Sequence, residues 1–443
     1  MCSIAGSPDQ REVLGMLMVM DHRAPDDLGT YSTDSYSVGM GRLKIIDLTS
    51  QGLCPIRDGD LTLVFNGELY NYLELREELT SLGVSFQTEG DSEVLMKSYI
   101  EWGVSMFDKL NWMGAFAILK NDGDLLLGRD LAGEKPLYYA INEDGFRFAS
   151  EAKALAFECQ EFPAASFGIY TASHKELHIK KWWNFVPKER NITLEEAVSE
   201  LDILLEDAVK IRTRADVQYG LYYSGGVDST LISSYHNFEH FYTYTANPPF
   251  DEQEFKEIFA KILWHLDYPV STFSPYGLWK LARQAKEQGT KVVLSGEGAD
   301  ELFGGYIRYV PNEFNRKAQQ IFPSYKALFP YKDMQNEEFY GNMQELLRMG
   351  DRMAGAWGIE NRCPFLDRRI IEFAMCLPME LKIQGYETKI VLKALLKKRV
   401  PSYQFEEKVG LYIPVATWLG SKDPFSKKEY RDYQQKLWET FKS

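Results

Sequence analysis

The sequence predicts an α/β protein with a sheet-rich first domain and a second domain built on a parallel sheet. Its 443 residues are enough for about two or three domains with cores of their own. Up to about residue 185, many short apolar runs alternate with turn residues, and few helical patterns lie between them. Beyond that point strands, glycine-rich loops and helices alternate, which favours a parallel sheet with helices on both faces.

The composition limits the classes of partner. Hydrophobic residues make up 45% of the chain and charged residues 26%, which is ordinary for a globular protein. A net charge of −14 argues against nucleic acid or an anionic membrane as the main partner. No apolar run is long enough to span a bilayer, and no basic segment followed by an apolar core marks a signal peptide. We therefore expect no membrane attachment.

The number and spacing of the five cysteines indicate the redox state of the compartment in which the protein works. Their number is odd, they are widely scattered, and no pair has Cys-x-x-Cys spacing. This pattern argues against a disulfide framework and against a zinc site. It favours the reducing cytoplasm.

The first domain, residues 1–185, is predicted from its short apolar runs. We expect strands over 41–48, 61–65, 113–119, 124–128 and 146–150, and helices over 73–82 and from Gly90 onward. The strand over 61–65 ends in Asn66-Gly67-Glu68, and an Asn-Gly pair taken alone is usually a hairpin turn. Asp91 or Ser92 can cap the second helix.

Cys2 directly follows the initiator methionine. Methionine is removed before small residues, so Cys2 can become the N-terminal residue. It would then carry a thiol nucleophile together with an α-amino group of pKa about 8, which is a suitable base for the thiol proton. A cysteine at this position is an accident in most proteins, so the inference depends on the motifs that follow it.

The second domain is predicted over 196–443, after a polar linker over 186–195 that contains Pro187. A helix is expected over 194–214, with Leu201, Leu205 and Val209 on its apolar face.

A glycine-rich loop over 224–230, Ser-Gly-Gly-Val-Asp-Ser-Thr, follows a predicted strand over 217–223 and precedes a helix. Adjacent glycines let backbone N–H groups approach a ligand, and the hydroxyls and the helix N-terminus favour an anion. The carboxylate of Asp228 suits a phosphate only if a cation such as Mg²⁺ lies between them. The loop therefore predicts a polyphosphate site with its metal, and the simpler alternative is a Gly-Gly turn between strand and helix.

A second glycine-rich loop, from Ser295 to Tyr306, follows a predicted strand over 291–294. Loops at the carboxyl ends of parallel strands face one crevice, so Asp228 and Asp300 are expected to share Mg²⁺ on ATP. The alternative for Asp300 is a solvated or capping carboxylate. The basic helix expected over 388–399 is, on its own, most often a solvated face.

The first half resembles the glutaminase domain of the class II glutamine amidotransferases, in particular the asparagine synthetase family. The resemblance rests on Cys2, 23–27, 42–46, 66–68 and 90–91, with Ala24 where the family has glycine. It implies an N-terminal-nucleophile αββα sandwich in which Cys2 attacks the glutamine amide. The Asn66 side chain and the Gly67 N–H would form the oxyanion hole. The residues implied in glutamine binding are Arg42, Leu43, Ile45, Ile46, Asn66, Gly67, Glu68 and Asp91.

The second half resembles the synthetase domain of the same family, an ATP-pyrophosphatase-type (adenine nucleotide alpha hydrolase-like) fold. The implied ATP-binding residues are Tyr223, Ser224, Gly225, Gly226, Asp228, Ser229, Thr230, Ser295 and Gly296. Asp228 and Asp300 would bind Mg²⁺. Glu297 and Lys389 take the positions that assist acyl-adenylate formation and amide transfer, roles that suit a base and a mobile cation.

The expected function is glutamine- and ATP-dependent amidation of a carboxylate through an acyl-adenylate, with aspartate as the default acceptor. The segment between Asp228 and Ser295 is shorter than is usual in the family, so a sugar acid, peptide or specialised metabolite stays open as acceptor. A catalytically silent binding or regulatory subunit is a further alternative. A β-lactam-forming relative is disfavoured, because Cys2 is present and Glu297 is not tyrosine. The sequence leaves a homodimer open.

Overall fold

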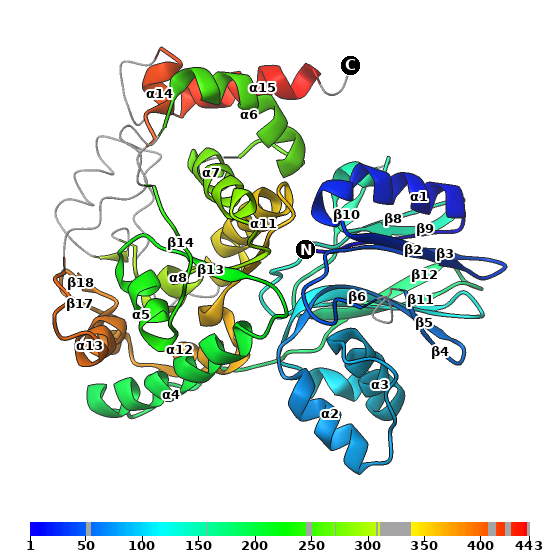
Figure 1. Ribbon diagram of the computed structural model, residues 1–443, viewed down its shortest axis with the longest axis horizontal. Coiled ribbons are helices and arrows are strands. Elements are labelled where there is room, and N and C mark those ends of the chain that lie inside the picture. Colours follow the sequence, from blue (N-terminus) through cyan, green and yellow to red (C-terminus); the bar gives the residue numbers. More distant parts are fainter. Residues whose placement is uncertain are drawn as a thin grey trace.

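The computed structural model describes residues 1–49, 55–156, 158–244, 250–270, 272–306, 309–310, 338–405, 413–420 and 427–440. Two antiparallel sheets form the first half of the molecule and a parallel sheet forms the second (Figure 1). The two halves lie side by side, and the N-terminus lies where they meet (Figure 1). The α/β class and its order along the chain are therefore confirmed.

The first half contains two six-stranded antiparallel sheets. The first sheet has the order β10 (Gln160–Glu161), β8 (Tyr138–Asn142), β9 (Gly145–Ala149), β1 (Ser3–Ser7), β3 (Ser37–Arg42) and β2 (Asp27–Ser32). The second has the order β12 (Glu176–Lys181), β11 (Ser166–Thr171), β7 (Leu125–Arg129), β6 (Trp112–Lys120), β5 (Leu61–Leu69) and β4 (Ile56–Asp58). Apolar side chains from both sheets, among them Ile4, Val38, Val64 and Leu127, form one buried cluster between them.

Helices cover the outer faces of both sheets. Helix α1 (Gln10–Val19) packs on β1 and β3, and its first turn is capped by Asp9, which accepts a hydrogen bond from the Arg11 N–H. Helices α2 (Tyr72–Ser81) and α3 (Asp91–Trp102) lie beyond the second sheet (Figure 1). Gly90, rather than Asp91 or Ser92, is the N-cap of α3. The layers are helix, sheet, sheet and helix, as the family resemblance implies.

The strand expected over 41–48 is wrong beyond Arg42, where β3 ends. Asp47 has a φ of 54°, in the left-handed region, which a strand cannot contain. The segment also folds back on the strand, because Arg42 Nη2 donates to the carbonyls of Ile46 at 2.9 Å and Asp47 at 2.7 Å. These carbonyls are therefore satisfied by a side chain instead of a sheet partner.

The second half is built on a four-stranded parallel sheet with the order β14 (Phe241–Tyr242), β13 (Tyr219–Tyr222), β15 (Val292–Leu294) and β16 (Glu360–Arg362). One face is covered by α4 (Leu194–Arg212), α5 (Val227–Tyr235), α8 (Ala299–Phe303), α12 (Arg368–Cys376) and α13 (Ile390–Arg399). The other face packs on α7 (Ser274–Glu287) and α11 (Asn342–Gly355), and α6 (Glu252–Leu266) packs against these two helices. A hairpin of β17 (Ile383–Gln384) and β18 (Glu387–Thr388) precedes α13, and α14 (Val415–Trp418) and α15 (Lys428–Thr440) follow it.

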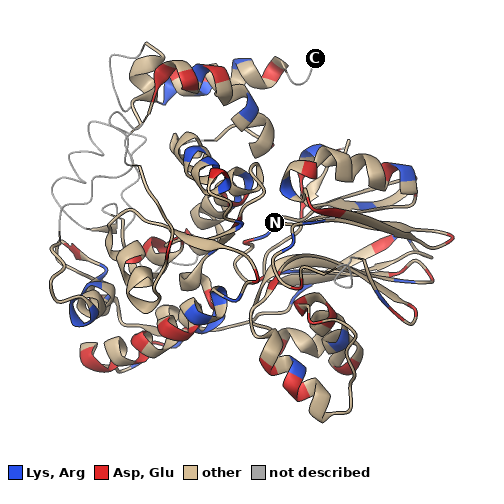
Figure 2. Ribbon diagram, viewed as in Figure 1, with Lys and Arg blue, Asp and Glu red and all other residues tan. Residues whose placement is uncertain are grey.

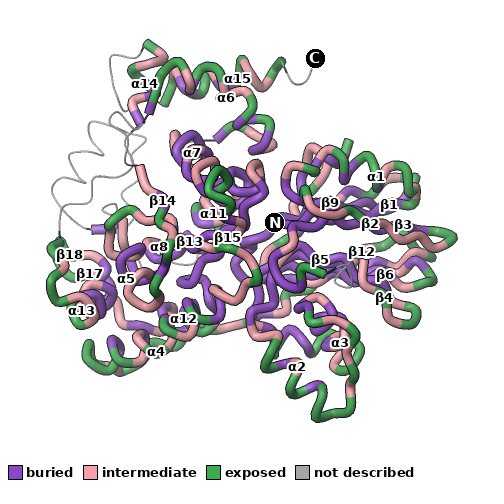
Figure 3. Tube along the Cα trace, in the orientation of Figure 1, coloured by how far each residue is buried: buried purple, intermediate pink, exposed green. Residues whose placement is uncertain are grey.

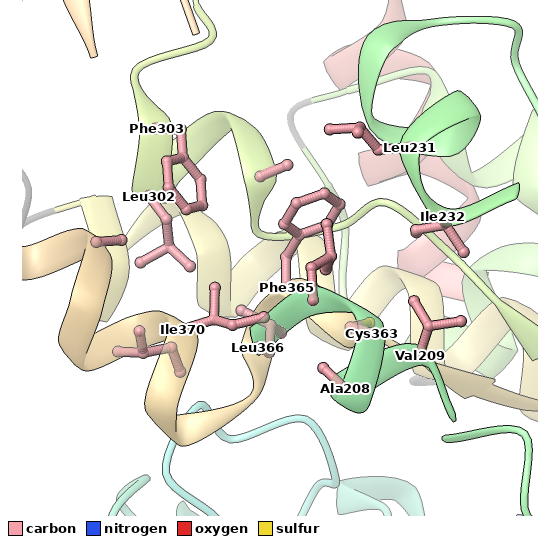
Figure 4. Packing of buried hydrophobic residues seen from close by; sticks show 14 of the residues in the cluster. Ala208, Val209, Leu231, Ile232, Leu302, Phe303, Cys363, Phe365, Leu366 and Ile370 are labelled. Atoms are coloured by element: carbon pink, nitrogen blue, oxygen red, sulfur yellow. The ribbon is translucent and has the colours of Figure 1, made fainter. Parts of the chain in front are cut away.

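The core under the first of these faces is continuous. Figure 4 shows Val209, Leu231, Ile232, Phe365 and Ile370 packed together between α4, α5 and α12. The buried segments in Figure 3 follow the strands, while the outward turns of the helices are exposed. Burial of this kind is the main driving force for the fold.

The connection between the halves is short. The last strand of the first half ends at Lys181, and α4 begins at Leu194, so residues 182–193, all described, carry neither helix nor strand. Thr193 and Glu196 form a reciprocal capping box at the start of α4. Helix α4 thus begins inside the linker expected over 186–195.

Charges of both signs are spread over the helices of both halves, and some also lie where the halves meet (Figure 2). There Arg23 of the first half, fully buried, lies 2.8 Å from Asp351 of α11 and 2.9 Å from Glu151. Buried pairs of this kind fix the relative placement of the two halves, because separating them leaves uncompensated charges. Among the described helices, none combines the length and the hydropathy that crossing a membrane requires.

Candidate active site

The first candidate centre lies at the start of β1. Cys2 is buried, belongs to the cluster between the two antiparallel sheets, and its Sγ lies 4.0 Å from the Leu43 carbonyl. Burial raises the pKa of the thiol. Met1 is present and buried in the structure, and burial lowers the pKa of its amino group to about 5. The amine thus stands one residue before the thiol that it would serve.

Asn66 and Gly67 on β5 have the features of an oxyanion hole. Asn66 is fully buried, and neither its Nδ2 nor its Oδ1 has a hydrogen-bond partner within the described chain. A buried amide without partners is costly unless a ligand satisfies it. At Gly67 an added Cβ would lie 2.1 Å from the Met113 carbonyl, so only glycine fits. β5 lies in the sheet that faces β1, and Cys2 directly precedes β1.

Arg42 uses only part of its guanidinium in hydrogen bonds within the described chain. Its Nη2 is used by the loop carbonyls, whereas Nη1 is buried without a described partner, which suits a carboxylate ligand. Asp91 is buried and accepts a hydrogen bond from the Leu69 N–H at 3.0 Å. Leu43, Ile45 and Ile46 are buried in the loop that Arg42 holds.

Glu68 has a partner that the sequence did not reveal. Its Oε2 lies 2.7 Å from Arg362 of the parallel sheet, while its Oε1 is buried with no partner within the described ranges. Arg362 also binds Glu360 at 2.8 Å. Half of the Glu68 carboxylate is therefore engaged across the domain boundary. The predicted role in binding glutamine remains with the other oxygen.

Ala24, where the family has glycine, has a φ of −137°. That value lies outside the left-handed region, so the methyl group introduces no backbone strain.

The second candidate centre lies at the carboxyl end of the parallel sheet. After β13 the chain turns through Ser224 and Gly225, both exposed, and enters α5 at its N-cap, Gly226. Gly225 has a φ of 72°, which favours glycine. Ser229 and Thr230 are buried instead: the Ser229 Oγ lies 3.2 Å from the Ser224 Oγ, and the Thr230 hydroxyl lies 3.4 Å from that of Tyr223. These two residues hold the loop in shape.

The two glycine-rich loops meet, as parallel-strand topology predicts. An added Cβ at Gly296 would lie 2.8 Å from the Asp228 Cβ, so glycine permits the close approach of the second loop to the first. Ser295 is buried at the end of β15, where its N–H donates to the Arg362 carbonyl at 3.0 Å.

Lys389 joins the carboxylates of both loops. Its Nζ lies 2.7 and 2.6 Å from the two Asp228 oxygens and 2.7 Å from Asp300 Oδ1. Burial works against the charge on Lys389, but the two carboxylates outweigh it and raise the lysine pKa. Lys389 itself has a φ of 55° at the N-cap of α13. Three distant segments thus place the two carboxylates around the Lys389 cation, and the Mg²⁺ expected between Asp228 and Asp300 stays a prediction.

These two carboxylates fit Mg²⁺. Mg²⁺ is usually held by one or two protein carboxylates together with water and phosphate oxygens. No group of three or more His, Cys, Asp or Glu side chains able to hold a metal occurs among the residues that the structure describes. If Mg²⁺ binds with ATP phosphates, Asp228 and Asp300 are the residues that would hold it.

Glu297 follows Gly296 and is held by two side chains that the sequence did not identify. Its Oε2 accepts hydrogen bonds from Asn361 Nδ2 at 2.9 Å and from Cys363 Sγ at 3.5 Å. Burial raises the Glu297 pKa to about 7, which suits a group that takes and returns protons near neutral pH. The segment 359–367 is dense in polar residues, but spacing alone does not show which of them reaches Glu297.

Known proteins resemble both halves of the chain. Residues 1–179 match a family model described as a glutamine amidotransferase domain, and residues 200–247 and 237–434 match one described as asparagine synthase. Asparagine synthetase B [glutamine-hydrolyzing] of Escherichia coli is 30% identical, with 96% of this chain and 82% of the relative covered. Asparagine synthetase [glutamine-hydrolyzing] 1 of Bacillus subtilis is 28% identical, with 94% and 86% covered.

A plant relative, asparagine synthetase [glutamine-hydrolyzing] 3 of Arabidopsis thaliana, is 30% identical, with 91% of this chain and 74% of the relative covered. The matches extend over both halves of the molecule and over both candidate centres. The chain therefore belongs to the asparagine synthase family of glutamine-dependent amidotransferases.

Proposed function

We propose that this protein hydrolyses glutamine at Cys2 and uses the ammonia to amidate a carboxylate that ATP has activated as an acyl-adenylate, with aspartate as the acceptor. The observation that carries the proposal is the convergence of Asp228, Asp300 and Lys389 at the end of the parallel sheet. Together with a buried N-terminal thiol in the other domain, it gives one chain two separate reactive centres.

In the glutaminase half, removal of Met1 would transfer the terminal amine to Cys2, so that the amine can take the thiol proton. The thiolate then attacks the glutamine side-chain amide. The Asn66 amide and the Gly67 N–H stabilise the charge on the amide oxygen, and such donors contribute about 3–4 kcal/mol each. Arg42 and the remaining oxygen of Glu68 suit the α-carboxylate and α-amino groups of glutamine.

In the synthetase half, backbone N–H groups of the exposed turn at Ser224 and Gly225 bind the phosphates of ATP. Asp228 and Asp300 would hold Mg²⁺, which would neutralise phosphate charge. Lys389, which pairs with both carboxylates, would meet charge that develops on the α-phosphate and the acceptor. Glu297 takes a proton from the ammonia nitrogen as the amide forms.

Keeping both centres in one protein has a chemical reason. Ammonia at neutral pH is mostly ammonium, which is not a nucleophile. Production of ammonia beside the activated acyl group avoids that loss and protects the adenylate from water.

The proposal is tested with purified protein, glutamine, aspartate and MgATP. We expect glutamate, AMP and pyrophosphate to form together, with an amide product from aspartate. Formation of glutamate and AMP only with another carboxylate would reassign the acceptor. Failure to form either product would overturn the proposal and favour a silent binding subunit.

A further inference from the structure

Residues 43–47, here called the Arg42 loop, belong to the glutaminase half but to neither of its two sheets. β3 ends at Arg42, and the carbonyls of Ile46 and Asp47 accept hydrogen bonds from Arg42 Nη2. The apolar side chains of the loop are buried in a core cluster that is built mainly from the synthetase half. The loop thus packs on the other half of the molecule, while it orients a residue of its own half.

Asp216, between α4 and β13, binds this loop from the synthetase half. Its backbone N–H donates to the Ile45 carbonyl at 2.9 Å, and its Oδ2 accepts a hydrogen bond from the Asp47 N–H at 2.9 Å. These two loop residues flank Ile46, whose carbonyl accepts from Arg42 Nη2. Asp216 therefore fixes the backbone on both sides of a carbonyl that orients the guanidinium.

Lys291, which directly precedes β15, binds the start of the same loop. Its Nζ donates to the Lys44 carbonyl at 3.5 Å and to Asp26 Oδ2 at 2.7 Å. The same Asp26 oxygen accepts a hydrogen bond from the Lys44 N–H at 2.7 Å. Both backbone polar groups of Lys44 are thus held, and one of them is held directly by the synthetase half.

The orientation of the Arg42 guanidinium matters because of its other terminal nitrogen. Nη1 is buried without a partner in the described part of the chain, and it is the group that suits the α-carboxylate of glutamine. The N–H groups of a guanidinium form a rigid fork, so they match a carboxylate only in a fixed orientation. The loop carbonyls set that orientation, and Asp216 and Lys291 hold the loop.

We propose that Asp216 and Lys291 are positioning residues of the glutamine site: from the synthetase half, they hold the Arg42 loop in the conformation that aligns Arg42 with the α-carboxylate. The inference rests on the proposed function. Both residues act through Arg42 and not by contact with glutamine. A chain that lacks these contacts should still hydrolyse glutamine, but it should bind glutamine more weakly.

The two residues lie at the ends of β13 and β15 that are remote from the nucleotide site. Asp216 and Lys291 precede these strands, whereas the glycine-rich loops proposed to bind ATP follow them. Changes at either residue should therefore leave the ammonia-dependent reaction intact. The alternative is that these contacts only dock the two halves. In that case their loss would affect both activities equally or neither of them.

The test compares Asp216→Ala and Lys291→Met, which remove the contacts, with Asp216→Asn, which keeps an acceptor oxygen for the Asp47 N–H. The matched control is Glu74→Ala, because Glu74 forms a different contact between the two halves, with Arg214 at 2.6 Å. For each full-length enzyme, KM and kcat of glutamate formation are measured with glutamine. AMP formation is measured separately with ammonium chloride, aspartate and MgATP.

We expect Asp216→Ala and Lys291→Met to raise KM for glutamine at least about threefold, which is the effect of losing a hydrogen bond, and to leave kcat within about twofold. Weaker binding of a part of the substrate that does not react raises KM without lowering kcat. Asp216→Asn and Glu74→Ala should stay within about twofold of the wild type. AMP formation from ammonium chloride should be unchanged in every variant.

An unchanged KM for glutamine in both Asp216→Ala and Lys291→Met would overturn the proposal. Equal losses of glutamate and AMP formation would also overturn it, because they would mark these contacts as docking contacts only. If the wild type forms no glutamate from glutamine, the proposed function fails instead.

A second measurement does not depend on turnover. In a Cys2→Ala background, which lacks the nucleophile, isothermal titration measures the affinity for glutamine directly. Addition of Asp216→Ala should weaken this affinity at least about threefold, and addition of Asp216→Asn should leave it unchanged. The variants should fold, because Asp216 is exposed and substitutions at exposed positions usually change stability little. Equal affinities with and without Asp216→Ala would contradict the assignment.

Discussion

Asn361 and Arg362 are neighbours on β16, and their side chains contact different centres: Arg362 lies 2.7 Å from Glu68, and Asn361 lies 2.9 Å from Glu297. Successive side chains of a strand point to opposite faces, so one short strand can serve both domains. Any displacement of β16 changes both centres together. This strand therefore fixes the position of Glu68 in one centre relative to Glu297 in the other.

Cys2→Ala should remove glutamine use and leave synthesis from added ammonia. The variant lacks the nucleophile, so we expect glutamate formation to fall at least about a thousandfold. AMP formation with ammonium chloride should stay within about twofold of the wild type, because Cys2 contacts none of the groups around Asp228. Cys159→Ala is the matched thiol control. Simultaneous loss of both activities in Cys2→Ala would contradict the division of labour.

Asp228→Asn should have the opposite pattern. Removal of one carboxylate from the proposed metal site should reduce AMP formation at least about a hundredfold, while basal glutamate formation continues. Asp207→Asn, which alters an aspartate on the surface of α4, is the control. Both products are measured in the same sample, and undiminished AMP formation in Asp228→Asn would exclude the proposed metal site.

Lys389→Met should expose the carboxylate pair to metal in the absence of ATP. Lys389 holds Asp228 and Asp300 at 2.6 and 2.7 Å, at the position that a cation would take between them. We expect Mn²⁺ alone to raise the melting temperature of Lys389→Met by several degrees and that of the wild type by little. Lys393→Met, one turn further along α13, should behave like the wild type. An equal response to Mn²⁺ in all three proteins would show that Lys389 does not compete with metal.

Cys363→Ala should shift the pH dependence of AMP and amide formation. Burial raises the Glu297 pKa to about 7 even though the Cys363 hydrogen bond, which stabilises the charged carboxylate, lowers it. Without this bond the pKa rises further, and the acidic limb of the rate profile should move to higher pH. The rate on the alkaline plateau should change less than the rate on the acidic limb. Profiles of kcat measured with ammonium chloride at saturating substrates test this, and an unshifted limb would show that Glu297 is not the group that titrates.

Asp367→Ala should destabilise the protein. Asp367 is fully buried, lies 2.9 Å from Arg212, and accepts a hydrogen bond from Asn111 of the glutaminase half at 2.9 Å. Loss of the carboxylate leaves Arg212 as a buried charge without its partner, which costs about 3–5 kcal/mol. Thermal unfolding of the variant, with Asp207→Asn as the surface control, measures this loss. A decrease in melting temperature no larger than that of the control would contradict it.

The same contacts predict a dependence on acid. Burial opposes ionisation of Asp367, but Arg212 and Arg369 outweigh it and hold the folded-state pKa below the ordinary value. A lowered folded pKa gives stability that is present above the unfolded pKa of about 4 and is lost as pH falls through the folded value. The wild type should therefore lose stability below about pH 4 more steeply than Asp367→Ala.

The sequence predicted those parts of the molecule that are encoded by residues adjacent to one another along the chain. The glycines at 225 and 226, the carboxylate at 228 and the strand before them form one continuous motif, and parallel topology then places the second loop beside it. The extension of the strand to Leu48 failed, because the apolar residues of 43–46 are buried in a loop at the domain boundary. A buried loop can contain the same apolar residue types as a buried strand, so the sequence does not distinguish the two.

The contacts between the halves were not predictable. Arg362 and Glu68 are separated by 294 positions, and nothing in the spacing pairs them. Asn361 and Cys363 also look like ordinary core residues until Glu297 is placed next to them. Such pairs depend on how two domains dock, and this docking has no periodic signature in the sequence.

The buried Met1 has a practical consequence. Its side chain packs among Leu281, Val293 and Ile359 of the other half, and its amino group is enclosed. A purification tag added ahead of this residue would have to pass between packed side chains, and it would also block the Met1 removal on which the proposed function depends. Recombinant protein intended for assay should carry its tag on the C-terminal side.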